Sequence, residues 1–275
     1  MDEPKRRSNH SNHEVFNHNV SMTQDKTQLG YVRTEQRGGV RTVEFHHPSH
    51  NSLPGRLLRE LRDAIDAAGA DDTVRVVVLR SGGERTFCAG ASFDELKSIR
   101  NAAEGEAFFL GFANVINAMR RCPKFIIGRV QGKAVGGGVG LASAVDYCFA
   151  TRYASVKLSE LAIGIGPFVI APAVERKVGL SKMSQMGINA TAWYTAEWAQ
   201  TAGLYAAVSE TTEGMDARID ELVQQLDGCH VAAMRDLKRV FWQNTDHWDD
   251  LLAERARTSG TLILSDFCRN YLAAL

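Results

Sequence analysis

Backbone N–H groups in a glycine-rich stretch are the first candidates for chemistry in this chain. Residues 130–150 contain three consecutive glycines, Gly136, Gly137 and Gly138, which follow an apolar run at 125–130 and precede a small, apolar segment that can form a helix. Glycine has no Cβ, so a ligand can approach its backbone closely. The first turn of a helix leaves N–H groups unpaired at the positive end of its dipole. We therefore expect this corner to hold an oxygen that carries negative charge.

The spacing of these glycines excludes the two common nucleotide-binding motifs. A phosphate-binding loop needs G-x-x-x-x-G-K-[ST], and no lysine follows the glycines here. A dinucleotide fingerprint needs G-x-G-x-x-G, whereas Gly136, Gly138 and Gly140 give G-x-G-x-G. On this stretch alone, close packing of a helix against a sheet explains the glycines better than a binding site does.

A second stretch makes a binding site the better explanation. Residues 87–96 read F-C-A-G-A-S-F-D-E-L, in which Gly90 follows a buried-looking strand and precedes a helix expected at 93–99. The two glycine corners lie one strand–helix–strand crossover apart. In an open parallel sheet such corners meet at the carboxyl ends of the strands, where ligands bind. The sequence therefore predicts one site that both corners build.

Composition limits the class of protein. The 275 residues, with 44% hydrophobic content, suit one large domain, and the net charge of zero argues against dedicated binding to nucleic acid or to a membrane surface. No apolar run reaches the roughly 18 residues of a membrane helix, so we expect a soluble, cytoplasmic protein. The scattered cysteines favour reduced thiols without a zinc site, and His46, His47 and His50 lack partners at metal-ligand spacing.

The pattern along the chain alternates strands and helices. Residues 1–29 are polar and without periodicity, and we expect them to be a disordered extension. A hairpin is expected at 31–45, and a helix after Pro54 places apolar residues at spacings of three and four. Further strands are expected at 74–79 and 124–130, helices at 103–121 and 168–178, and amphipathic helices in the last third of the chain. This order predicts an α/β fold.

The motifs together resemble those of a known family. The stretch F-C-A-G-A-x-F-D-E-L lies about 45 residues before G-K-A-V-G-G-G-V-G-L-A, which is followed by D-Y-C-F-A-T and K-L-S-E-L-A-I-G-I-G-P. This pairing resembles the crotonase superfamily, the enoyl-CoA hydratases and isomerases, including proteins described as methylglutaconyl-CoA hydratases. The resemblance implies a ClpP/crotonase-like fold of repeated ββα units over 30–210 and a C-terminal helical trimerisation region over 211–275. It also implies a homotrimer or a dimer of trimers.

The resemblance further implies site residues. In the family, two backbone N–H groups hold the oxygen of an acyl-CoA thioester, one from the alanine of the first motif and one from a glycine of the second. Matched to this sequence, the two donors are Ala89 and Gly137. The motif positions expected to contact the substrate or its coenzyme A are Ala91, Phe93, Asp94, Gly136 and Gly138. Coenzyme A is then part of the substrate, and neither a cofactor nor a metal ion is expected.

The family's catalytic carboxylates are matched only in part. Hydratases of the family carry two glutamates that hold one water; the first falls on Gly140 and is absent, and the second falls on Glu160, after Ser159 in place of the usual proline. A buried glutamate should have a raised pKa, which suits a base that exchanges protons near neutral pH. A solvated surface glutamate is the alternative interpretation of Glu160. Glu95 is a weak candidate for a second acid, because a solvated helix face explains it better.

Several functions remain open at this point. Moving a double bond needs one base, Glu160, whereas hydration needs this residue to manage both water and proton or a second acid from elsewhere. The resemblance therefore implies an enoyl-CoA hydratase or isomerase with a single glutamate base. A non-catalytic subunit that binds acyl-CoA and an acyl-CoA decarboxylase are the alternatives.

Overall fold

A six-stranded sheet forms the centre of the molecule. The computed structural model describes Met1 and residues 29–274, so most of the extension expected at 1–29 lies outside the described residues. The strand order is β1-β2-β3-β5-β7-β9. Its first pair is antiparallel, as the expected hairpin requires, and the other pairs are parallel. The strands are β1 (Tyr31–Arg37), β2 (Val40–His46), β3 (Val76–Ser81), β5 (Phe125–Val130), β7 (Tyr147–Thr151) and β9 (Ala207–Ser209).

A second, smaller sheet carries the glycine corners. It consists of three parallel strands, β4 (Thr86–Cys88), β6 (Lys133–Val135) and β8 (Val156–Lys157). Each follows a strand of the large sheet directly and leads into a helix, which gives the repeated ββα units that we expected. One detail of the expectation is wrong: the glycines at 136–138 follow β6 and not the strand at 125–130. The break at Gln131 and Gly132 turns the chain from one sheet to the other.

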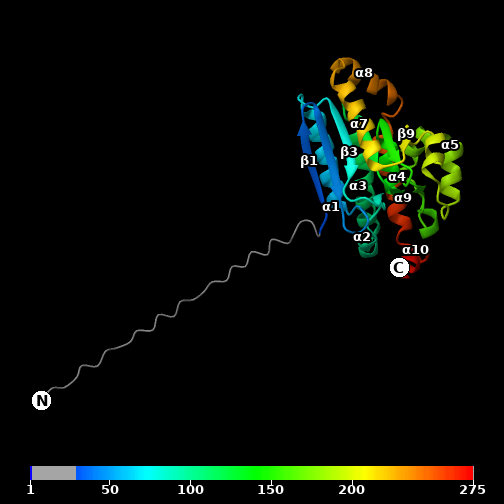
Figure 1. Cartoon of the computed structure of the whole chain (residues 1–275). Helices are drawn as coiled ribbons and strands as arrows, with labels where there is room; N and C mark the ends of the chain where they lie inside the picture. Colours follow the sequence, from blue (N-terminus) through cyan, green and yellow to red (C-terminus); the bar gives the residue numbers. More distant parts are fainter. Residues whose placement is uncertain (2–28, 275) are drawn as a thin grey trace.

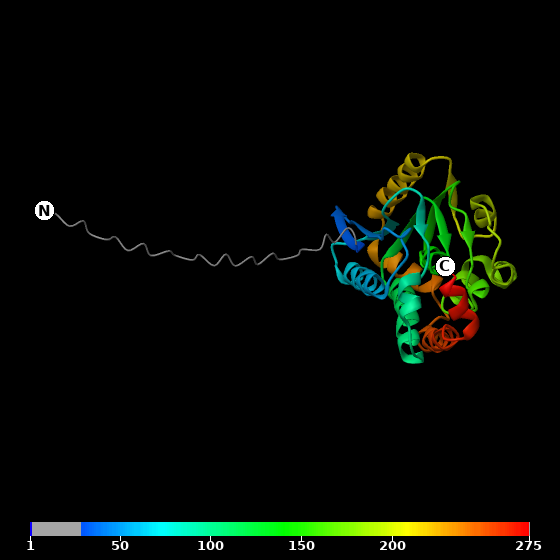
Figure 2. The same ribbon diagram turned by 90° about the horizontal axis from the view of Figure 1, so that it is seen from below.

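Helices cover both faces of the large sheet (Figures 1 and 2). Polar side chains at Ser92, Asn101 and Thr195 accept N–H groups at the first turns of the helices that follow them. The helices are α1 (Gly55–Ala70), α2 (Phe93–Ser98), α3 (Ala102–Arg121), α4 (Gly137–Ala144), the 3-10 helix η1 (Leu161–Ile163), α5 (Ala171–Ile188), α6 (Ala196–Thr201), α7 (Thr212–Asp227), α8 (Val231–Phe241), α9 (Trp248–Leu262) and α10 (Asp266–Ala273).

Strand β3 shows why the sequence has continuous apolar runs. Its residues alternate between two cores: Val77 and Leu79 pack into the main core, and Val76 and Val78 pack into a second core under α7. A parallel strand with both faces covered has no solvent side, so apolar residues occupy the first four positions of β3. The expected apolar face of α1 is also buried, at Leu57, Leu58, Leu61, Ile65 and Ala68.

The C-terminal helices pack back onto the body of the molecule. Helix α9 lies along α3, and α10 contacts α2 and η1 (Figure 2). A glycine on each of the paired helices makes this approach possible, because a Cβ on Gly105 of α3 would lie 2.7 Å from the Cα of Gly260 on α9. The expected helical region is therefore present, and its role in trimer formation stays a prediction. Among the described helices, none is long and apolar enough to cross a membrane.

Candidate active site

The two glycine corners lie side by side, as the sequence predicts. Strands β4 and β6 are neighbours in the small sheet, so the turns that follow them meet. A Cβ built on Gly90 would lie 2.9 Å from the carbonyl oxygen of Val135 and 3.3 Å from the nitrogen of Gly137. The φ angle of Gly90 is +86°, in the left-handed region that glycine adopts most easily. Only glycine fits at this contact.

Gly137 presents an unused backbone donor at the start of α4. The first helical hydrogen bonds run from Val139 and Gly140 to the carbonyl oxygen of Gly136, at 2.8 and 3.2 Å. Within residues 29–274, no described hydrogen bond uses the N–H of Gly137. This is the arrangement expected at a helix N-terminus, where the first N–H groups have no partner within the helix.

The N–H of Ala89, which we predicted as the second donor, is already used in a hydrogen bond within the chain. Its N–H donates to the carbonyl oxygen of His50 at 3.1 Å. Two residues later, the carbonyl of Gly90 accepts the N–H of Leu53 at 2.8 Å. Because the C=O and N–H of one trans peptide point in opposite directions, the N–H of Ala91 points away from Leu53. No hydrogen bond among the described residues uses it, so Ala91 is a better candidate than Ala89 for a free donor at this corner.

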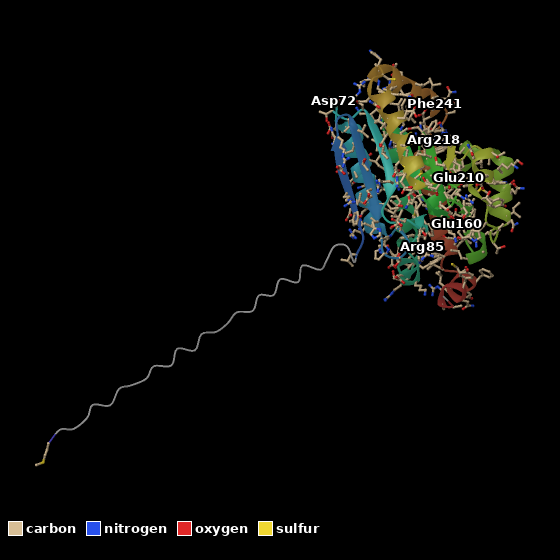
Figure 3. All side chains as sticks on the ribbon, in the orientation of Figure 1. Asp72, Arg85, Glu160, Glu210, Arg218 and Phe241 are labelled. Atoms are coloured by element: carbon tan, nitrogen blue, oxygen red, sulfur yellow. The ribbon has the colours of Figure 1, made fainter. Side chains whose placement is uncertain are left out.

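Strand pairing carries Glu160 to these corners. Strand β8 pairs with β6, and the N–H of Gly136 donates to the carbonyl oxygen of Lys157 at 2.9 Å. Glu160 follows at the start of η1. A Cβ built on Gly136 would lie 2.7 Å from Oε1 of Glu160, so the carboxyl group lies directly beside the glycine turn. In Figure 3 the labels of Glu160 and Arg85 lie close together in the lower part of the folded body.

The carboxyl group of Glu160 is desolvated. The residue as a whole is only partly buried, but its Oε2 is inaccessible to solvent and has no hydrogen-bond partner among the described atoms. This burial raises the pKa of Glu160 from 4.5 to about 7, although backbone hydrogen bonds from Glu160 and Ser159 act in the opposite direction. The interpretation of Glu160 as a solvated surface residue is therefore wrong. The group can both take and give a proton near neutral pH.

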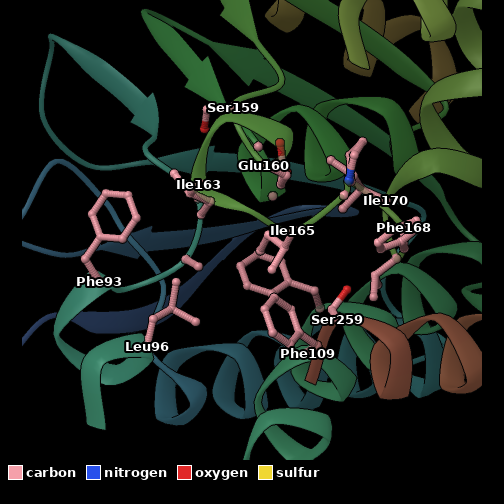
Figure 4. A pocket seen from close by; sticks show the side chains of 18 of the residues that line it. Phe93, Leu96, Phe109, Ser159, Glu160, Ile163, Ile165, Phe168, Ile170 and Ser259 are labelled. Carbon is pink, nitrogen blue, oxygen red and sulfur yellow. The ribbon is translucent and has the colours of Figure 1, made fainter. Parts of the chain in front are cut away.

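The carboxyl faces an apolar pocket with about 570 Å³ of empty space, part of which is open to solvent. Among the described residues that line it, Glu160 is the one with an acidic side chain. Of the predicted positions, Ala89, Ala91, Phe93, Gly136, Gly137 and Glu160 line the pocket. The remaining lining side chains include Phe109 and Phe112 of α3, Ile163 of η1, Ile165, Phe168 and Ile170 of the segment after η1, and Ser259 of α9. Figure 4 labels all of these except Phe112.

Three predicted positions lie elsewhere. Asp94 is exposed on α2, and a Cβ on Gly138 would overlap the carbonyl of Cys88, so this glycine serves helix-to-strand packing. Neither residue lines the pocket. Glu95 accepts the N–H of Gly55 at 2.6 Å and thereby joins α2 to the first residue of α1. We expected Glu95 on a solvated helix face, but its carboxylate is used in this contact. Glu95 also does not line the pocket, so it is not a second acid there.

A second depression shares one lining residue, Ala89, with the pocket. It carries two cations, Arg85 and Lys133, together with His50 and Trp193. The ammonium of Lys133 lies 5.0 Å from the centre of the Trp193 ring, a distance typical of cation–π contact. An apolar pocket next to a groove with two cations suits a ligand with an apolar end and an anionic end. Among residues 29–274, no group of three or more metal-ligating side chains lies together.

Comparison with protein families matches residues 35–260 to the family model "Enoyl-CoA hydratase/isomerase". The chain belongs to this family. Its relatives include methylglutaconyl-CoA hydratase of Mus musculus, 30% identical over 196 residues, which are 71% of this chain and 62% of that protein. The short-chain-enoyl-CoA hydratase of Clostridium acetobutylicum is 31% identical over 191 residues, 69% of this chain and 72% of that protein.

Members of the family with other names match as well. Carboxymethylproline synthase of Pectobacterium carotovorum is 32% identical over 156 residues, 56% of this chain and 62% of that protein. The matched segments of these curated relatives thus span about three fifths of the relatives' length in several cases. The solved enoyl-CoA hydratase of Bacillus halodurans superposes with a TM-score of 0.83 at 19% identity, over 89% of this chain and all of that one. The fold is therefore the crotonase fold.

Proposed function

We propose that this family member is an acyl-CoA enzyme that moves a double bond by means of one base, Glu160. The observation that supports this most is the carboxyl of Glu160, which lies beside Gly136 in an apolar pocket and has a pKa of about 7. A base whose pKa lies near the working pH is populated in both its protonated and its deprotonated form, so it can accept a proton and return it. This is what a reaction with one carboxylate requires.

The reaction also requires donors that stabilise a negatively charged thioester oxygen, and the two free N–H groups can supply them. Removing a proton from C2 of a 3-enoyl thioester pushes negative charge onto the thioester oxygen. The N–H groups of Ala91 and Gly137 would donate to that oxygen and stabilise it most when its charge is fullest. Loss of one such donor typically lowers the rate by about 10²–10³-fold.

Glu160 alone can carry out both proton transfers of this reaction. The carboxylate breaks the C2–H bond, the double bond shifts from C3=C4 to C2=C3, and the same carboxyl delivers the proton to C4. No proton, water or electron from elsewhere is needed. The cost of keeping an unpaired carboxyl in an apolar pocket argues against the alternative of a subunit without catalysis, since such a subunit would gain nothing from it.

The cationic groove suits the coenzyme A end of the substrate. Phosphates carry negative charge, and Arg85 and Lys133 line the groove that adjoins the pocket at Ala89. The acyl group would enter the apolar pocket and the nucleotide end would lie along the groove. In this proposal the thioester would lie near Ala89, which lines both the pocket and the groove.

The proposed assembly is a homotrimer or a dimer of trimers, in line with the expectation from sequence. Helix α8 exposes Leu237, Val240 and Phe241, and such a group of apolar side chains suits contact with another chain. Phe241 lies at the opposite end of the molecule from Arg85 in Figure 3. Assembly through α8 would therefore leave the mouth of the pocket open.

The test offers a panel of acyl-CoA esters to the enzyme in deuterated water and follows masses and products. The wild type should exchange the C2 hydrogen and convert 3-enoyl to 2-enoyl esters. Glu160→Gln should lose both activities while binding acyl-CoA normally, because the amide preserves volume. Glu84→Gln, at an exposed glutamate, is the matched control and should behave as the wild type. Isomerisation by Glu160→Gln at the wild-type rate would refute the proposal, and loss of carbon dioxide from a carboxylated acyl-CoA would favour a decarboxylase.

A further inference from the structure

We infer that Ile170 decides between proton transfer and hydration in this pocket, an inference that rests on the proposed function. Ile170 fills the place that a side chain at position 140 would need. A Cβ built on Gly140 would lie 2.8 Å from the Cβ of Ile170, and the three nearest atoms all belong to this one residue. Ile170 is 4% exposed and lines the pocket together with Glu160. The absence of a carboxylate at position 140 is thus compensated by an apolar side chain.

The backbone holds Ile170 in this place. It is the N-cap residue of α5, and its carbonyl accepts the N–H of Val174 at 3.1 Å. A proline in the first turn of α5 fixes the direction of the chain, since its φ angle is restricted. Arg255 of α9 donates to the carbonyl of Phe168, two residues earlier, at 3.3 Å. The side chain cannot leave Gly140 without moving the start of α5.

The surroundings of Glu160 are unfavourable for a catalytic water. Figure 4 shows Ile170 and Glu160 at the same end of the pocket, with Ile163 and Ile165 nearby. An ordered water in a protein interior needs two to four polar partners. Oε2 of Glu160 has no partner of its own, and Ile170 occupies the side from which a second carboxylate would act. The side of the pocket that Ile170 occupies is therefore apolar and has no room for a second carboxylate.

This arrangement separates two reactions of one substrate class. Hydration of a 2-enoyl thioester forms a bond from the water oxygen to C3 and places a proton on C2, so it needs a water held beside the carboxyl. Isomerisation moves a proton from C2 to C4 and needs no water. Ile170 excludes the first reaction by occupying the space and leaves the second unaffected.

The test is a cycle of four proteins: wild type, Gly140→Glu, Ile170→Gly, and the double variant. Glycine is chosen at 170 because it removes both atoms nearest to position 140 and is tolerated at an N-cap. Gly140→Glu alone should lose isomerisation without gaining hydration, because its side chain meets Ile170. The double variant should hydrate a 2-enoyl-CoA at least tenfold faster than either single variant. Incorporation of ¹⁸O from labelled water measures the product.

A matched control and a second readout keep the test decisive. Ile165→Gly removes a side chain of the same size from the same pocket, and with Gly140→Glu it should give no gain in hydration. If the double variant does not fold, as judged by its melting curve, the ratio of hydration to isomerisation in Ile170→Ala replaces it and should rise at least tenfold.

Two failures can be told apart. Equal hydration by the Ile165→Gly and Ile170→Gly double variants, or an unchanged ratio in Ile170→Ala, would overturn the role of Ile170 while C2 exchange in the wild type remains. Absence of Glu160-dependent exchange in the wild type would instead overturn the proposed function itself.

Discussion

Replacing Glu160 with glutamine should stabilise the protein at alkaline pH and not at acid pH. The carboxyl has a pKa of about 7 in the folded chain and 4.5 as the ordinary value, which applies to the unfolded chain. As the pH rises from 4.5 to about 7, the unfolded chain therefore loses this proton first. Wild-type stability falls over this window and is constant, for this group, above and below it. The glutamine variant lacks the proton and so lacks the fall.

The size of the effect follows from the difference between the two pKa values. At about 1.4 kcal/mol per pH unit, a rise from 4.5 to about 7 corresponds to about 3 kcal/mol of free energy of unfolding. For a protein of this length, about 2–4 °C of melting temperature corresponds to 1 kcal/mol. We expect Glu160→Gln to melt about 6–12 °C above the wild type at about pH 8.5, with little difference at about pH 4.

Urea denaturation across this pH range measures the effect directly. The slope of unfolding free energy against urea should be equal in both proteins, so that the midpoints report stability alone. Glu84→Gln serves again as the control, because it makes the same carboxyl-to-amide change at an exposed position. A Glu160→Gln protein that follows the wild type at every pH would show that the carboxyl is hydrated, and the argument for a base near pH 7 would fail with it.

Three further predictions follow from other parts of the structure. Gly137→Val should lower kcat/KM by at least about 10²-fold and also lower the melting temperature, since its Cβ would overlap the ring of Phe112; a normal rate would place the oxyanion elsewhere. Asp146→Ala should lower the free energy of unfolding by about 3–5 kcal/mol in urea, because it leaves Lys238 buried without the ion pair at 2.8 Å and removes the acceptor of Trp242. Sedimentation should find a multiple of three chains, and a monomer at micromolar concentration would contradict the proposed assembly.

Local patterns were enough to predict most of the elements. The apolar face of α1 and the continuous run in β3 follow directly from the period of the chain, and both are buried as expected. In the small sheet the strand β6, which has three residues, was missed. Strands this short carry too few residues for a period, and their pairing is set by the ββα repeat and not by local pattern.

The site could be predicted only where backbone shape determines the residue type. Gly90 and Gly136 have positive φ angles and neighbours that exclude a Cβ, so their identity was visible in the sequence. The choice of donor was not visible. Whether Ala89 or Ala91 keeps a free N–H depends on hydrogen bonds to a loop about 40 residues earlier, at His50 and Leu53. Sequence positions alone do not show which of these N–H groups is hydrogen-bonded to that loop.

The apolar wall of the pocket was missed for a similar reason. Its side chains come from α3, from η1 and the segment after it, and from α9, and each looks like an ordinary core residue in its own stretch of sequence. The one signal was indirect. Gly140, a glycine within a predicted helix where the family has a carboxylate, implies that another residue fills the space, but not that the residue is Ile170.

Position and acidity of Glu160 arise from the same contacts, which gives a last prediction. The N–H of Ile165 donates to the carbonyl of Glu160 at 3.0 Å, and the N–H of Gly136 holds Lys157, so the segment on both sides of the carboxyl is fixed and the side chain stays in the pocket. Admitting water beside it, by Ile170→Gly, should then lower the pH at which C2 exchange begins and reduce the loss of stability between about pH 4.5 and 7. Both shifts come from one change in solvation, so they should agree in size when converted at about 1.4 kcal/mol per pH unit. A shift in exchange without a shift in stability would mean that a group other than Glu160 sets the pH dependence of catalysis.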